Sequence, residues 1–253
     1  MSEGMLSGKV IVITGASTGI GADAARVCAR EGARLILSAR SEDTLRELVD
    51  ELRATGAEAH SVAGDIANAN TARRMVAAAM ERFGRLDGAF NNAGISGSGP
   101  LIDVQEDEFD RLWNVNVKGT WFSLREEVRA IRATGHGGSI VNTSSVSGVK
   151  GSVGLGSYQA TKHAVIGLTR TAAHDNGPAG IRVNALAPGA TSTETFLAWR
   201  AREPEAVDAR VARIPLGRAA LPSEVGEAAA WLLSERSGTI SGIVLPIDGG
   251  FTA

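Results

Sequence analysis

Tyr158 and Lys162 carry acid–base chemistry and lie four residues apart in a segment with helical periodicity. On an α-helix this spacing places both side chains on one face, one turn apart. Free tyrosine has a pKa of about 10, too high for efficient proton transfer near neutrality, and a nearby ammonium group favours the phenolate. Tyr158 is also the only tyrosine of the chain. The pair therefore predicts an acid–base device in which Lys162 lowers the pKa of Tyr158.

Ser145 precedes Tyr158 by thirteen residues and follows an apolar run that ends at Thr143. Parallel α/β sheets bind their ligands beyond the carboxyl ends of the strands, so Ser145 and Tyr158 are expected at one site. Ser144 competes for the same position. The alternative explanation is an ordinary tyrosine and an exposed lysine, as in most pairs with this spacing.

A glycine-rich turn follows the first expected strand and reads Thr14-Gly15-Ala16-Ser17-Thr18-Gly19-Ile20-Gly21. Gly15 permits a sharp turn, Gly19 allows the backbone to approach a pyrophosphate, and Gly21 allows close packing of helix and sheet. The following helix directs free N–H groups and a positive dipole end at the phosphates. A turn without a ligand is the alternative, but the strand before and the helix after favour a dinucleotide.

Short apolar runs alternate with helical patterns along the whole chain, which predicts a parallel sheet covered on both faces. The expected fold is α/β, a single doubly wound Rossmann-type domain over residues 1–253 with seven strands. A polar segment at about 190–213, interrupted by Pro204, is expected to form a mobile substrate lid. The strands are expected at Val10–Thr14, Arg34–Ser38, Glu58–Ala63, Gly88–Asn92, Ser139–Thr143, Ile181–Leu186 and Ile243–Leu245, and the longest helices at Gly19–Glu31, Asp107–Ala133, Tyr158–Asn176 and Glu224–Leu233.

Composition narrows the classes of function. The 253 residues include 26 Lys and Arg against 28 Asp and Glu, with 43% hydrophobic and 21% charged residues, values that exclude intrinsic disorder. A net charge of −2 argues against nucleic acid as a partner, because phosphate binding needs clustered Lys and Arg. No apolar run is long enough to span a membrane.

A cytoplasmic location is expected from two further features. Residues 1–8 lack the basic and apolar regions of a signal peptide, and the single Cys28 cannot form an internal disulfide. No metal site is expected, because the four histidines show no ligand spacing with Cys or carboxylates.

Taken together, these motifs resemble the classical short-chain dehydrogenase/reductase family. Thr14–Gly21 is similar to the cofactor motif of that family, and the further matches run along the chain in family order. They are Asp65, Asn91-Asn92-Ala93-Gly94, Asn116, Ser145, Tyr158-Gln159-Ala160-Thr161-Lys162, Pro188-Gly189 and Asp248-Gly249-Gly250.

The resemblance implies four catalytic residues. Tyr158 would exchange a proton with the substrate oxygen, Ser145 would hydrogen-bond that oxygen, and Lys162 would also hold the nicotinamide ribose. Asn116 would position a water that links Lys162 to solvent. A kink in the expected long helix explains Asn116 equally well from sequence alone.

The resemblance also implies a nicotinamide cofactor, and the end of the second strand bears on its type. An acidic residue there would select NAD, but the position holds Ala39, and Arg40 follows with a guanidinium that can grip a 2′-phosphate. NADP(H) is therefore favoured, with NAD(H) as the alternative in which Glu42 or Asp43 serves the ribose. Thr18 favours NAD(H), because many NADP-preferring members of the family carry a basic residue at this position, just before the second glycine of the motif. The expected cofactor-binding residues are Gly15, Ser17, Thr18, Gly19, Ile20, Gly21, Arg40, Asp65, Ile66, Asn92, Ala93, Gly94, Tyr158, Lys162, Pro188, Gly189, Thr191 and Thr193.

The resemblance implies an oxidoreductase that transfers a hydride between the nicotinamide and a small-molecule secondary alcohol or ketone. A β-ketoacyl carrier-protein reductase is a narrower alternative, and a non-catalytic nicotinamide-binding regulatory protein is an alternative of another class. A homotetramer is expected by resemblance.

Overall fold

The strands of the sheet are short and mostly apolar, as expected where helices cover both faces. The computed structural model describes residues 4–253, so Met1–Glu3 of the N-terminal segment discussed above lie outside the described residues. All strand pairs are parallel, and the sheet has the order β3-β2-β1-β4-β5-β6-β7. The strands are β1 (Val10–Thr14), β2 (Arg34–Ala39), β3 (Ala59–Ala63), β4 (Gly88–Asn91), β5 (Gly138–Thr143), β6 (Ile181–Pro188) and β7 (Val244–Ile247).

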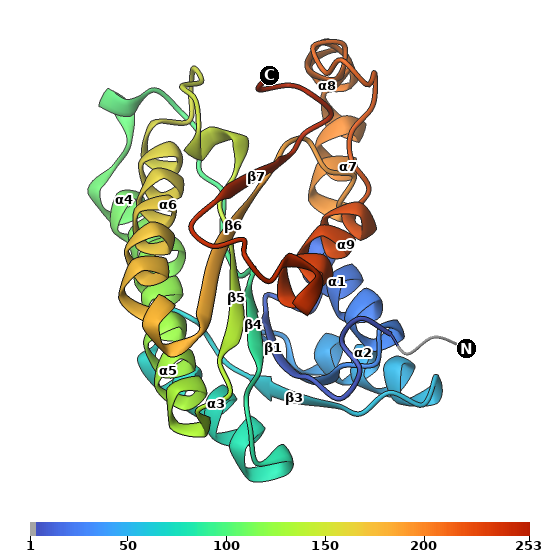
Figure 1. Ribbon diagram of the computed structural model, residues 1–253. Helices are drawn as coiled ribbons and strands as arrows, with labels where there is room; N and C mark the ends of the chain where they lie inside the picture. Colours follow the sequence, from blue (N-terminus) through green and yellow to red (C-terminus); the bar gives the residue numbers. More distant parts are fainter. Residues whose placement is uncertain (1–3) are drawn as a thin grey trace.

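Six helices form two layers, one on each face of the sheet (Figure 1). Each layer encloses its own cluster of buried apolar side chains. One layer consists of α1 (Gly19–Arg30), α2 (Glu42–Ala54) and α9 (Pro222–Leu233), and the other of α3 (Ala69–Phe83), α5 (Gly119–Thr134) and α6 (Gly156–Asn176). The predicted doubly wound, seven-stranded α/β fold is thus confirmed.

The strand order reverses between β1 and β4, which are neighbours in the sheet. Their register pairs Thr14 with Asn91, so the loops that follow these two strands leave the sheet side by side. Doubly wound folds bind their ligands at this kind of switch point, beyond the carboxyl ends of the strands.

The expected helix from Asp107 to Ala133 is divided into three parts. A regular helix α4 (Glu106–Leu112) leads into a π-helix, η2 (Trp113–Lys118), and then into α5. Asn116 lies within η2, where its side chain binds the backbone of Ile95 in a neighbouring loop. Single π-turns inside helices are a known cause of irregular helix geometry and are common at functional sites.

The predicted polar segment forms two short helices, α7 (Glu194–Arg202) and α8 (Pro204–Val211). Pro204 is the first residue of α8. A proline at this position breaks no helical hydrogen bond, because the first N–H groups of a helix have no partner within it. Both helices project beyond the sheet at the upper end of Figure 1. Four 3₁₀ turns complete the described secondary structure, at Leu101–Asp103, Val146–Gly148, Gly177–Ala179 and Glu235–Ser237.

Two structural features are absent from residues 4–253. None of the described helices is both long and apolar enough to cross a membrane. Within the same residues no group of three or more His, Cys, Asp or Glu side chains is placed to hold a metal ion.

Candidate active site

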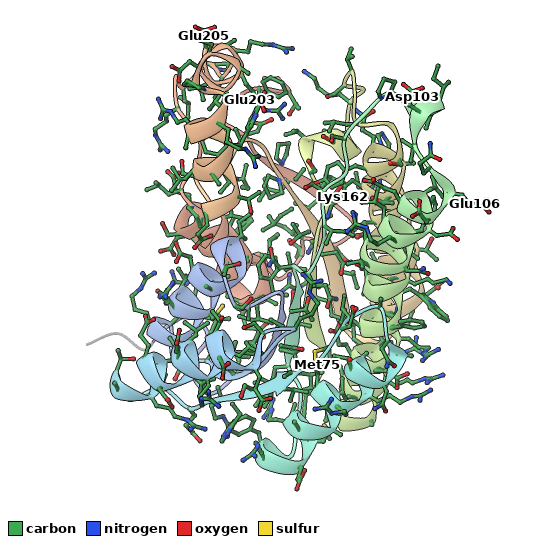
Figure 2. The ribbon with its side chains drawn as sticks, turned by 180° about the vertical axis from the view of Figure 1, so that it is seen from behind. Met75, Asp103, Glu106, Lys162, Glu203 and Glu205 are labelled. Atoms are coloured by element: carbon green, nitrogen blue, oxygen red, sulfur yellow. The ribbon has the colours of Figure 1, made fainter. Side chains whose placement is uncertain are left out.

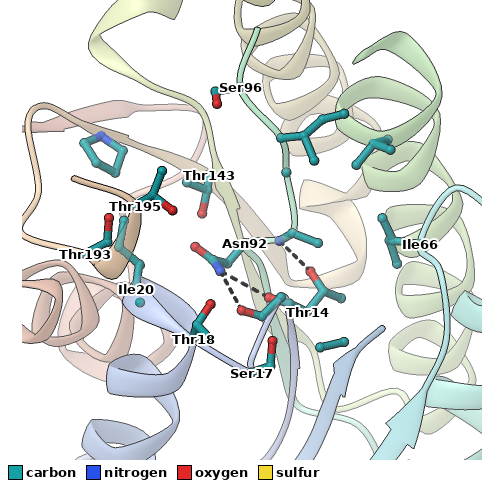
Figure 3. A pocket seen from close by; sticks show the side chains of 18 of the residues that line it. Thr14, Ser17, Thr18, Ile20, Ile66, Asn92, Ser96, Thr143, Thr193 and Thr195 are labelled. Atoms are coloured by element: carbon teal, nitrogen blue, oxygen red, sulfur yellow. Dashed lines mark hydrogen bonds between the residues drawn. The ribbon is translucent and has the colours of Figure 1, made fainter. Parts of the chain in front are cut away.

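A cavity of about 840 Å³ lies at the switch point, beyond the carboxyl ends of the strands (Figure 3). Of the predicted site residues, all but Gly21 and Asn116 line it. The predicted residues at its wall are Gly15, Ser17, Thr18, Gly19, Ile20, Arg40, Asp65, Ile66, Asn92, Ala93, Gly94, Ser145, Tyr158, Lys162, Pro188, Gly189, Thr191 and Thr193.

The glycine-rich turn is held by the loop after β4. The Asn92 side-chain amide donates to the carbonyls of Thr14 and Gly15 over 3.3 and 3.2 Å, and the Ala93 N–H donates to Thr14 Oγ1 over 3.0 Å (Figure 3). A Cβ atom on Gly21 would lie 2.1 Å from the Gly15 carbonyl oxygen. Gly21 therefore serves the site without lining it, because no side chain fits between turn and helix.

The first turn of α1 fits an anionic group. Thr18 precedes this helix, and its side chain makes no capping hydrogen bond. The N–H groups that begin a helix lack helical partners and attract anions. Gly15 and Gly19 have φ angles of 64° and 54°, in the region that favours glycine. The turn thus presents backbone N–H groups, with little side-chain bulk, to the cavity.

The end of β2 gives the cavity a positive charge and no carboxylate. Ala39 is buried, and the exposed Arg40 lines the cavity. Glu42 and Asp43 lie in the first turn of α2, as expected from helix-dipole preferences. Two neighbouring serines, Ser38 and Ser41, also line the cavity. Ser38 donates to the Val62 carbonyl over 2.8 Å, and the Ser41 side chain caps α2.

Tyr158 and Lys162 lie one turn apart on α6, with the Lys162 Nζ 5.7 Å from the centre of the Tyr158 ring. Lys162 is only 4% exposed, lies in the interior of the molecule (Figure 2) and donates to the Thr143 carbonyl over 2.9 Å. Burial lowers the pKa of Lys162 to about 8. The ammonium form is thus retained at neutral pH but is close to losing its proton.

The expected direction of the tyrosine shift is wrong for the polypeptide alone. Burial raises the pKa of Tyr158, and interactions with the Ser145 side chain and the charge of Arg210 oppose this shift without reversing it. The Lys162 amine is instead directed at the Thr143 carbonyl. Tyr158 is therefore a neutral phenol at neutral pH, the form that can donate a proton.

The hydrogen bonds distinguish Ser145 from Ser144. The Ser144 hydroxyl is buried and donates to the Lys162 carbonyl over 2.9 Å, so it fixes α6. The Ser145 Oγ accepts from the Ser147 N–H over 3.1 Å, an interaction that leaves its own proton free to be donated. Ser145 also interacts with the Tyr158 side chain. The geometry thus favours Ser145 as the serine beside the tyrosine.

Asn116 is buried behind the cavity wall. Its Oδ1 accepts from the Ile95 N–H over 2.8 Å, and its Nδ2 donates to the Ile95 carbonyl over 2.9 Å and to Thr161 Oγ1 over 3.0 Å. A Cβ atom on Gly94 would lie 3.2 Å from Asn116 Oδ1 and 3.3 Å from Lys162 Nζ. The absence of a side chain at Gly94 therefore keeps open the space between the asparagine and the lysine.

Several lining residues were not expected from sequence. Gly64 and Ile95 adjoin the predicted Asp65 and Gly94, so adjacency is an available signal, while Glu194 and Thr195 lie within the segment 190–213 that is expected to form the lid. Thr143 contributes a backbone carbonyl, which no residue type reveals. The unexpected residues include Gly64, Ile95, Val115 and Thr143. Phe196 and Trp199, the two aromatic residues of α7, pack edge to face at 6.1 Å and are not among the residues that line the cavity.

Comparison with known proteins places this site in a family. Residues 15–252 match the family model described as enoyl-(acyl carrier protein) reductase. The chain is 45% identical over 251 residues to the A-factor type γ-butyrolactone 1′-reductase (1S-forming) of Streptomyces virginiae, covering 99% of this chain and 98% of that one. It is 41% identical over 251 residues to the 2,5-dichloro-2,5-cyclohexadiene-1,4-diol dehydrogenase of Sphingobium indicum, covering 98% of each.

A solved structure agrees with these relatives. The crystal structure of a short-chain type dehydrogenase/reductase from Mycobacterium marinum superposes with a TM-score of 0.90 at 34% identity, covering 98% of this chain and 97% of that one. The fold, the sequence relatives and the family match all agree along nearly the whole chain. The chain therefore belongs to the short-chain dehydrogenase/reductase family and is an NAD(P)-binding oxidoreductase.

Proposed function

We propose that this enzyme transfers a hydride between a nicotinamide cofactor and a secondary alcohol or ketone. The observation that carries the proposal is that Ser145, Tyr158 and Lys162 line one cavity. The glycine-rich turn, which suits a pyrophosphate, lines the same cavity. A regulatory protein that merely bound the cofactor would have no need of the Tyr158 and Ser145 hydroxyls, which serve a substrate oxygen, beside Lys162 in this cavity. Catalysis is thus favoured over the regulatory alternative.

The side chains divide the work at the substrate oxygen. In the reductive direction Tyr158, a neutral phenol, donates its proton to the carbonyl oxygen as negative charge develops there. Ser145 donates a hydrogen bond to the same oxygen and stabilises that charge. The Lys162 ammonium favours the phenolate that remains, and Asn116 holds the water that relays a proton to it. When bound, the nicotinamide supplies or accepts the hydride.

The remaining lining residues would hold the dinucleotide. The turn Gly15–Gly21 and the N-terminus of α1 suit the pyrophosphate. Asp65 and Ile66 would contact the adenine, and Asn92–Gly94 the adenosine ribose. Residues 188–193 would contact the nicotinamide, through the backbone of Pro188, Gly189 and Thr191 and the hydroxyl of Thr193.

A small cyclic carbonyl or alcohol compound is the proposed substrate class. One relative is named as a γ-butyrolactone reductase and another as a cyclohexadiene-diol dehydrogenase, so ring compounds occur in both reaction directions. The alternative of a β-ketoacyl carrier-protein reductase draws on the family description, which names an acyl carrier protein. Nicotinamide oxidation measured over cyclic ketones, diketones and acyl thioesters separates these alternatives, and turnover of acyl thioesters alone would favour the second.

The segment 190–213, with α7 and α8, is proposed to close over the substrate as a lid on the single catalytic domain. Thr193, Glu194 and Thr195 at its start already line the cavity, and the charge of Arg210 acts on Tyr158. Figure 2 shows Glu203 and Glu205 at its outer end, where the segment projects from the body of the molecule.

A cytoplasmic location is proposed as well, because the single thiol, Cys28, is buried and unpaired.

The proton-transfer proposal predicts distinct defects for two variants. Tyr158→Phe should lower kcat by about 100- to 10,000-fold, the usual contribution of general acid catalysis, with cofactor affinity nearly unchanged. Lys162→Ala should lose turnover and cofactor affinity together, because it has two roles. Steady-state kinetics and cofactor fluorescence titration measure both effects. Near-normal turnover in folded Tyr158→Phe would remove Tyr158 from the mechanism.

The cofactor proposal is a preference for NADP(H), set by Arg40 and the lack of a carboxylate at Ala39. Replacing both, as Ala39→Asp with Arg40→Ala, should move the ratio of kcat/KM values toward NAD(H) about ten- to hundredfold, the effect of one lost charge-assisted hydrogen bond and a new repulsion. Arg46→Ala is the control, since Arg46 is an exposed arginine on α2 paired with Asp43. A wild-type enzyme that prefers NAD(H), or an unchanged ratio in the double variant, would contradict this assignment.

A homotetramer is proposed from the outer face of α5. Trp121 is 43% exposed there, and Arg125 stacks 4.8 Å from its ring. Large apolar groups on an outer helix are typical of subunit contacts. Light scattering at micromolar concentration should give four times the 26.2 kDa chain mass, and Trp121→Glu should give a smaller species. A wild-type monomer would contradict the proposal.

A further inference from the structure

A cluster of polar side chains lies in the interior beneath the active-site cavity. We define the buried polar cluster as Asn91, Ser123, Glu127, Asn142 and Thr169, each at most 3% exposed. The Asn91 Nδ2 donates to Glu127 Oε2 over 2.9 Å and to Asn142 Oδ1 over 3.1 Å, and the Asn142 Nδ2 donates to Thr169 Oγ1 over 3.0 Å. One hydrogen-bonded chain thus crosses from α5 through β4 and β5 to α6.

Three members, Asn91, Asn142 and Thr169, lie on elements that also carry part of the proposed site. Asn91 ends β4 and directly precedes Asn92, which holds the glycine-rich turn. Asn142 directly precedes Thr143, whose carbonyl accepts from Lys162. Thr169 lies on α6, the helix of Tyr158 and Lys162. The cluster therefore links β4, β5 and α6, the elements that position the site.

The Glu127 carboxyl group is the one ionisable member of the cluster, and its surroundings favour the neutral acid. Burial raises the pKa of Glu127 to about 8, and the hydrogen bond from Asn91 opposes that shift. The Asn91 amide on β4 donates to this carboxyl group, and the buried Ser123 lies one turn away on the same helix. At neutral pH and below, burial keeps the proton on the carboxyl group.

The hydrogen bonds of the cluster also favour a protonated Glu127 carboxyl group. Three buried atoms of the cluster have no hydrogen-bond partner among residues 4–253: Asn91 Oδ1, Ser123 Oγ and Glu127 Oε1. An ionised carboxylate and an amide oxygen can both only accept, so the ionised cluster would be short of donors. A protonated carboxyl group adds one O–H donor and removes a buried charge.

We propose that Glu127 is a positioning residue whose neutral carboxyl group fixes the ends of β4 and β5, and through them the Thr143 carbonyl and the Asn92–Gly94 loop. This inference rests on the proposed function, because it assigns Glu127 to the support of Lys162 and of the cofactor turn. Glu127 touches no lining side chain that exchanges protons, so its effect on the reaction is indirect.

Two substitutions at Glu127 separate positioning from packing. Glu127→Gln keeps the shape, the neutrality and an acceptor for Asn91, and its kcat, cofactor affinity and pH profile should stay within about twofold of wild type. Glu127→Leu leaves the Asn91 amide without this partner. It should lower kcat about tenfold or more through misplacement of the reacting groups, weaken cofactor binding, and shift the pH dependence of kcat/KM. Glu126→Gln is the control, since the half-buried Glu126 pairs with Arg125 and Arg129 on the same helix and is not a member of the cluster.

A merely structural role would lower the stability of Glu127→Leu but leave the kinetics and pH profile of its folded fraction unchanged, and that result would overturn the proposal. A glutamine variant as impaired as the leucine variant would overturn it too, because a carboxylate would then be required. If the wild type turns over no ketone, the proposed function fails, and cofactor affinity still decides the role of Glu127.

Infrared spectroscopy tests the protonation state even if Glu127→Leu does not fold. The difference spectrum between wild type and Glu127→Gln at about pH 6, below the raised pKa, should contain the carbonyl band of a protonated carboxyl group. Isotopic shift of this band in glutamate-labelled protein would assign it. A difference spectrum with only carboxylate bands would overturn the proposal.

Discussion

A buried amine is the constraint around which the rest of the site is arranged. Lys162 is almost fully enclosed, and an ammonium group removed from water must find polar partners or lose its proton. The Thr143 carbonyl supplies one partner, which requires that α6 pack closely over the end of β5. Gly148 allows that approach, because a Cβ atom there would lie 2.3 Å from Ser144 Oγ and 2.8 Å from the Lys162 carbonyl oxygen.

The sheet brings the parts of the site together by its strand order. The segments after β1, β4 and β5 are far apart in sequence, yet they leave one edge of the sheet as neighbours. Side-chain hydrogen bonds then fix their ends: Asn92 bridges to the turn after β1, and the buried polar cluster joins β4 to β5. The site thus rests on rigid elements, as precise positioning of reacting groups requires.

The fold and most of the cavity wall could be predicted from the sequence because both follow local rules. Apolar β-branched runs indicate buried strands, and the glycine spacing at Gly15–Gly21 reflects a backbone that must turn and approach a helix closely. A kink at Asn116 is one explanation that the sequence offers, but residue types do not reveal the π-helical form of Trp113–Lys118 or the contact of Asn116 with Ile95. The Arg-Glu-Glu sequence at residues 125–127 resembles an exposed helix face, and only the packing of α5 shows that Glu127 is buried. The pKa of Tyr158 likewise depends on burial, which residue spacing does not reveal.

The most direct test of the account follows one hydrogen atom. The reduced cofactor labelled with deuterium at the transferring position of C4 is incubated with a ketone that the enzyme reduces, and the product alcohol is analysed by mass spectrometry. Direct transfer predicts one deuterium at the carbinol carbon, with the hydroxyl proton drawn from solvent through Tyr158. An alcohol with no deuterium at that carbon, or with a solvent-derived hydrogen there, would contradict the account.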